Sequence, residues 1–160
     1  MAVQDLAWVM IFLVFFAILI LVATYLADSI FPEIKDMIGD EGDALVDSAN
    51  YAFTVLDYVF LIVAVGVVIG VGVLAWRVNV SGIFIIFSIL VIVILVGVLA
   101  PTFKNVMWEM FNTTQFAGYE ADYPIMSKIF EHYPVFITIA SAILLIVMYA
   151  RYKHKESEGE

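Results

Sequence analysis

Asp57 is the residue whose position first suggests chemistry, because it directly precedes the uncharged run from Tyr58 to Trp76. A carboxylate within hydrocarbon is costly, so such residues are candidates for function by default. One interpretation makes Asp57 a proton or cation site. The other places it at the outer headgroup level, hydrated or paired with Lys104 or Lys128. A proton relay needs a second ionisable partner inside the membrane, and the apolar runs supply none.

Three glycines on the run that follows form a second pattern. Gly66 and Gly70 make a GxxxG motif, and Gly72 continues it. Small residues let helix backbones approach closely, and this drives helix association in lipid. The motif predicts either a contact with another subunit or packing within the chain's own bundle.

Two groups of acidic residues are candidates for cation sites. Carboxylates between positions 28 and 50 offer oxygen ligands for a hard cation such as Ca²⁺, although their spacing is not that of an EF-hand. The competing interpretation is a solvated negative surface. The segment 101–133 offers a mixed set with one histidine: Glu109, Glu120, Asp122, Glu131 and His132. One histidine without a partner is a weak signal for a metal, so we predict neither a metal site nor a cofactor.

Asn112-Thr113-Thr114 is an N-x-T sequon. It predicts glycosylation of Asn112 if this segment faces a compartment that has the machinery. The motif is short and common, so it says little more.

The composition restricts what such residues can do. Of the 160 residues 64% are apolar and 14% are charged, far from the balance of soluble domains. The net charge of −9 argues against nucleic-acid binding, which needs a basic surface. The absence of cysteine excludes disulfides, thiolate metal sites and cysteine nucleophiles. With only two histidines and no Ser–His–Asp pattern, we expect no enzyme.

Four apolar runs are each about as long as a helix needs to cross roughly 30 Å of hydrocarbon. We predict an all-α integral membrane protein, a single domain over 1–160, with four transmembrane helices in an up-down bundle. The expected segments are transmembrane helices 6–27, 51–76, 82–100 and 134–150, outer loops 28–50 and 101–133, and an inner tail 151–160.

Short amphipathic helices are expected in both outer loops. In the first, apolar residues recur at helical spacing from Ile30 to Ile38, and Gly39 can end the turn. The next helix is expected to begin outside the lipid near Ala44, capped by Asp43. The helix after it should stop at Pro101. Two apolar stripes, 103–111 and 125–133, then predict two short helices at the interface or over the bundle.

The distribution of Lys and Arg predicts the orientation of the chain in the membrane. Arg77, Arg151, Lys153 and Lys155 lie close together on the side of the termini, whereas three lysines are spread over the longer outer loops. The positive-inside rule therefore predicts that both termini are inside, in a plasma membrane or one derived from it.

The function that this pattern favours is a non-catalytic structural subunit. It would sit in the lipid bilayer and anchor or scaffold a larger assembly of other membrane subunits, in a cell or in a membrane-containing particle. The alternative is an oligomeric cation or proton channel, with Asp57 and the acidic outer loop near its mouth. The chain's sequence does not identify the partner.

Overall fold

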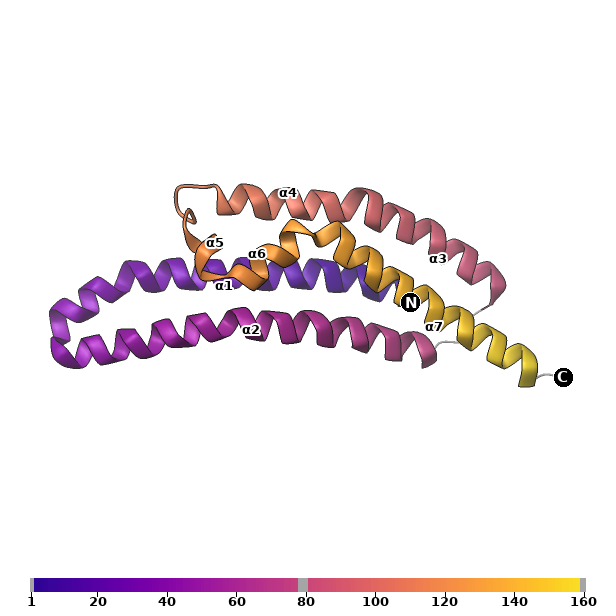
Figure 1. Cartoon of the computed structure of the whole chain (residues 1–160), viewed down its shortest axis with the longest axis horizontal. Coiled ribbons are helices and arrows are strands. Elements are labelled where there is room, and N and C mark those ends of the chain that lie inside the picture. Colours follow the sequence, from indigo (N-terminus) through magenta and orange to yellow (C-terminus); the bar gives the residue numbers. More distant parts are fainter. Residues whose placement is uncertain (1, 78–80, 159–160) are drawn as a thin grey trace.

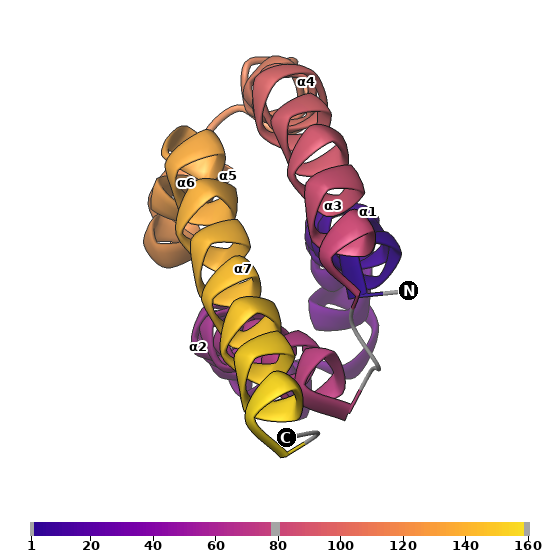
Figure 2. The same ribbon diagram turned by 90° about the vertical axis from the view of Figure 1, so that its right-hand side faces the viewer.

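The structure is a computed structural model that describes residues 2–77 and 81–158, and the described chain is almost entirely helical. Four stretches are long and apolar enough to cross a membrane, namely Val3–Ile38, Glu41–Arg77, Gly82–Phe111 and Tyr133–Ser157. These stretches confirm the all-helical class and are those of a multi-pass membrane protein. Figure 1 shows them lying along the long axis of the molecule, and Figure 2 looks along the bundle.

The first two helices form one long hairpin, α1 (Ala2–Ile38) and α2 (Asp40–Arg77). The separate short helix expected over 30–38 was wrong, because α1 runs through the acidic segment without a break and α2 begins at Asp40 rather than at Asp43. Gly39 does end the helix, with a φ of 67° that favours glycine. The turn is braced by an ion pair of 2.8 Å between Lys35 Nζ and Asp43 Oδ1. The helices α1 and α2 pack on each other. Each therefore covers apolar residues of the other that lipid or the rest of the bundle would otherwise have to cover.

The third span also continues past its expected end. The helix α3 (Gly82–Ile94) passes through a π-helical turn, η1 (Leu95–Leu99), into α4 (Ala100–Phe111). The stop predicted at Pro101 was therefore wrong. In the wider turn the N–H of Ala100 bonds to the carbonyl of Leu95, five residues back. A π turn of this kind can accommodate a proline, whose ring lacks the N–H and crowds the preceding turn of an α-helix.

Two short helices precede the last long one, α5 (Tyr119–Asp122) and α6 (Pro124–Glu131), followed by α7 (Tyr133–Glu158). The helix expected over the second apolar stripe is confirmed as α6. It packs against α2 and α4, with Met126 and Phe130 buried. The turn predicted between Arg77 and Gly82 lies mostly outside the described residues, but Ser81 Oγ accepts the N–H of Phe84 at the start of α3.

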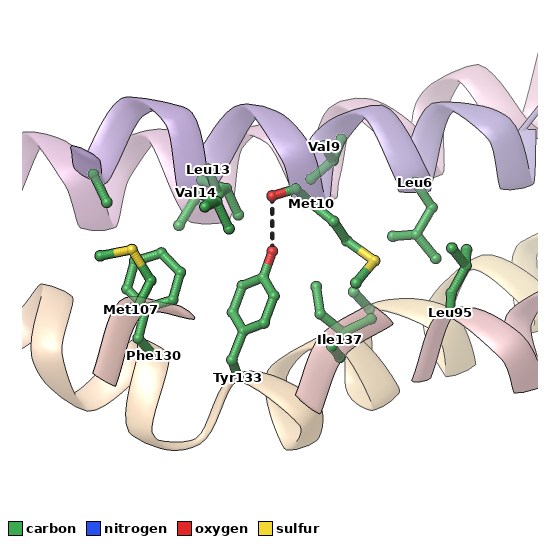
Figure 3. Close-up of a cluster of buried hydrophobic side chains, with 14 of the residues drawn as sticks. Leu6, Val9, Met10, Leu13, Val14, Leu95, Met107, Phe130, Tyr133 and Ile137 are labelled. Atoms are coloured by element: carbon green, nitrogen blue, oxygen red, sulfur yellow. Dashed lines mark hydrogen bonds between the residues drawn. The ribbon is translucent and has the colours of Figure 1, made fainter. Parts of the chain in front are cut away.

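The core is an apolar layer between α1 and the helices that face it. Figure 3 shows Leu6, Met10 and Leu13 of α1 opposite Tyr133 and Ile137 of α7, all fully or almost fully buried. Leu95 of η1, Met107 of α4 and Phe130 of α6 complete this layer. Large apolar side chains also cover the outer faces of the long helices. Such faces suit a hydrocarbon solvent, in which an exposed Ile or Leu costs nothing.

Candidate functional site

Asp57 lies inside the bundle, and only 3% of it is exposed. Both of its carboxylate oxygens accept hydrogen bonds from the backbone of α6. The N–H of Ile125 donates to Oδ2 at 2.9 Å, and the N–H of Met126 donates to Oδ1 at 2.8 Å. These residues follow Asp57 by almost 70 positions, so the contact is purely tertiary.

The start of α6 explains why a carboxylate is needed there. The first N–H groups of a helix have no partner within the helix. Pro124 has no N–H to satisfy, and Tyr123, in the capping position, makes no side-chain cap. Asp57 takes the place of that cap from another helix, and its negative charge also suits the positive end of the helix dipole.

This geometry corrects the expectation that Asp57 is hydrated or paired with a lysine. Neither Lys104 nor Lys128 forms an ion pair with it in the part of the chain that the structure describes. The carboxylate is bound by peptide groups instead, which no spacing rule in the sequence could reveal. Its visible chemical role is to hold α6 against α2.

Three tyrosines fasten the same region to α1. Tyr119 donates its hydroxyl hydrogen to Asp28 Oδ2 at 2.6 Å, and the hydroxyl of Tyr123 bonds to that of Thr24. Further down, the Tyr133 hydroxyl donates to the backbone oxygen of Met10 at 2.9 Å. Burial is the main cause that raises the pKa of Tyr119, and the hydrogen bond to Asp28 is the second. Burial also raises the pKa of Tyr123. Both phenols are therefore protonated at ordinary pH.

A small polar pocket of about 190 Å³ lies beside the first two of these contacts, between α1, α2 and α5. Its lining is rich in oxygen: Thr24, Asp28, Asn50, Thr54, Asp122 and Tyr123, with Phe53 as the apolar member. Sequence reasoning missed it, because its parts come from three segments far apart in the chain. Two carboxylates without a basic residue in the lining give the pocket a negative potential.

Known proteins offer no guide to this site. The chain matches no protein family, no curated protein and no solved structure. Its chemistry must be judged from its own geometry.

The three glycines of the motif on α2 make no close contact with the other described helices. A side-chain carbon built on Gly66, Gly70 or Gly72 would meet no atom within 4 Å. Ile62 and Ile69 on the same stretch are 70% and 61% exposed. Within residues 2–77 and 81–158, close packing against another helix, one of the two interpretations of the motif, does not occur at these positions.

The remaining candidate residues are not brought together. Among residues 2–77 and 81–158 no three His, Asp or Glu side chains are grouped closely enough to hold a metal ion. His132 Nδ1 lies 3.7 Å from Glu131 Oε2, its sequence neighbour. Asn112 is exposed just after α4, and its Nδ2 donates to the carbonyl oxygen of Trp108 at 2.8 Å. Its glycosylation stays a prediction.

Proposed function

We propose that the chain crosses the membrane four times in an up-down bundle, with both termini inside. Arg77 ends α2, and Arg151, Lys153 and Lys155 lie near the end of α7, so the basic residues fall at one end of the bundle. There the Arg151 guanidinium carbon lies 5.8 Å from the centroid of the Trp76 ring, an arrangement typical of a membrane interface. At the other end the α1–α2 hairpin carries the acidic segment.

Labelling of single cysteines tests this topology, since the chain has none of its own. Asp47→Cys near the hairpin turn should react with a membrane-impermeant maleimide on intact cells. Ser157→Cys should react only after the membrane is permeabilised. The reverse pattern would invert the orientation, and labelling of both on intact cells would overturn the four-span arrangement.

Within that topology we propose a non-catalytic structural subunit, which anchors or scaffolds a larger membrane assembly. The observation that carries this proposal is the open glycine face of α2, defined by Gly66 and Gly70. Small residues allow a second helix to approach closely, and helices associate in lipid through such packing. Because none of the described helices fills this face, a helix from another subunit can dock there.

The position of Asp57 supports the same proposal. Buried charged groups near spans usually mark pathways or relays. Here each carboxylate oxygen already accepts a backbone N–H, so the carboxylate serves the fold. The apolar layer of Figure 3 fills the space between α1 and α7, and a filled interior suits an anchor better than a pathway.

Blue native electrophoresis of mildly solubilised native membranes tests the proposal. We expect the chain in a species larger than its 17.9 kDa, and Gly66→Leu should shrink or dissociate that species. Gly97→Leu is the matched control, because Gly97 is also exposed and free of neighbours but lies on the π-helical turn. A monomer, or a complex indifferent to Gly66→Leu, would contradict this role.

The second candidate is an oligomeric cation channel, and the acidic pocket of Asp28 and Asp122 favours it. Tyr123 lines this pocket, and Asp57 binds the residues just after it. The negative potential would concentrate cations at an outer mouth. Liposome flux assays should then show cation flux that falls in Asp122→Asn and in Asp57→Asn. Because Asp57→Asn also disturbs α6, the Asp122 variant decides the outcome, and absence of flux removes this candidate.

A further inference from the structure

The junction between α6 and α7 opens a concave surface on the side of the bundle. Only His132 separates the two helices, and its carbonyl oxygen accepts the N–H groups of Val135 and Phe136. At this break the side chains of α6 and α7 line a shallow, open pocket of about 480 Å³.

A second pocket, of about 190 Å³, continues from the first. It lies between α2 and α7, and its lining includes Val65, Ile69, Ala140 and Ile143. Phe136 and Ile139 line both pockets, so the two form one groove down the face of α7. We refer to it as the α6–α7 groove.

The groove is polar at one end and apolar at the other. Lys128, Glu131 and His132 line its upper end, at the junction of α6 and α7. Every residue that lines its lower part, between α2 and α7, is apolar. From His132 to Ile143 the helix rises about 16 Å. That length matches one leaflet, since half of the hydrocarbon core is about 15 Å.

The charges at the upper end leave a cation available. Glu131 lies 3.7 Å from its sequence neighbour His132, while Lys128 has no ion pair within the described residues. A phosphate is the group that an unpaired lysine at a membrane surface attracts. Two of the helices that form the groove, α2 and α7, are long and apolar enough to span a bilayer, so lipid is the medium around its apolar part.

We propose that the α6–α7 groove binds one phospholipid, with its phosphate at Lys128 and one acyl chain along Phe136, Ile139 and Ile143. Length, polarity and charge along the groove all match this ligand. The proposal does not depend on the chain being a scaffold or a channel, because it concerns only the bilayer around this chain.

Photo-crosslinking tests the site directly. The purified full chain is reconstituted into liposomes containing a phospholipid with a diazirine on one acyl chain, and adducts are mapped by peptide mass spectrometry. We expect adducts concentrated on Phe136, Ile139 and Ile143. Ile139→Trp should fill the groove and abolish them. Ile86→Trp, at an exposed position of α3, should leave them unchanged.

Several outcomes would overturn the site. Adducts spread evenly over the exposed faces of the helices, or adducts insensitive to Ile139→Trp, would show a non-specific surface. If Ile139→Trp does not fold, as judged by circular dichroism, Ile143→Trp takes its place. Lys128→Ala tests the headgroup, since it should reduce co-purified phospholipid counted by native mass spectrometry. Unchanged retention would overturn the assignment of the phosphate to Lys128.

Discussion

The carboxylate of Asp57 caps a helix to which it is linked only through the fold, because its Oδ1 accepts the N–H of Met126 at 2.8 Å across 69 positions. Together with the bond from Ile125, this contact fixes α6 against α2. The residue that first suggested ion chemistry is therefore a structural link between the second span and the segment before the fourth.

Removal of the Asp57 carboxylate should destabilise the protein more than removal of an exposed acid. Asp57→Ala leaves two N–H groups at the start of α6 unpaired, one buried and one partly buried, which we expect to lower the free energy of unfolding by about 2–3 kcal/mol. Asp57→Asn keeps one acceptor oxygen, so its free energy of unfolding should lie between those of the unchanged protein and Asp57→Ala. Unfolding in mixed micelles by titration with SDS measures the effect.

Asp47→Ala is the control for that experiment, because Asp47 is exposed on the same helix. It should change the free energy of unfolding by at most about 0.5 kcal/mol. Equal losses in the two alanine variants would mean that the capping contact contributes nothing.

The Tyr133 hydroxyl should contribute a measurable part of the stability. Tyr133→Phe keeps the ring and removes the bond to the Met10 carbonyl, so we expect a loss of about 1 kcal/mol. Tyr149→Phe is the matched control, since Tyr149 is 58% exposed and should tolerate the change. The same unfolding assay applies, and an unaffected Tyr133→Phe would contradict the role given to this bond.

Tyr119 should ionise at higher pH than a free tyrosine. Burial and the bond to Asp28 raise its pKa, so the protonated phenol is favoured in the folded state. Its contribution to stability is thus fully present below the ordinary tyrosine pKa of about 10 and is lost as pH rises through the higher folded value.

Ultraviolet titration of the phenolate measures this shift. The difference spectrum between the native chain and Tyr119→Phe should show a late-titrating tyrosine. Asp28→Asn should move that titration back towards the ordinary value. A Tyr119 that titrates with the exposed tyrosines would be inconsistent with the contact to Asp28.

Two glycines of α2 should respond oppositely to alanine. A methyl group on Gly42 would lie 3.1 Å from the Ile34 carbonyl oxygen and 3.2 Å from the Lys35 Cα, so in Gly42→Ala the backbone of α1 must shift by a few tenths of an ångström. We expect a loss of about 1–3 kcal/mol. Gly70→Ala meets nothing within 4 Å and should be neutral or gain up to about 1 kcal/mol through helix propensity.

Hydrogen exchange near the hairpin turn gives a local readout for the glycine pair. Faster exchange around residues 34–43 in Gly42→Ala, with no change there in Gly70→Ala, is the expected pattern. If Gly42→Ala leaves exchange unaltered, the helices are not in close contact at this point.

The sequence by itself determined the helical class, the four apolar stretches, the helix-ending Gly39 and the helix that begins at Pro124. These features depend on hydrophobic length, on the backbone freedom of glycine and on the missing N–H of proline, and all of these are local. Local signals also misled at Pro101, because a π-helical turn lets the helix continue. In the acidic segment, packing of α1 on α2 sustained a helix where charge suggested a loop.

Only the tertiary structure decided what the candidate residues do. The partner of Asp57 is a pair of backbone N–H groups, and a backbone group leaves no mark in the sequence. The direction of the glycine face depends on how α2 is rotated against its neighbours, and helical spacing alone does not fix that rotation. The polar pocket and the α6–α7 groove combine residues from separate helices, so they exist only once those helices pack.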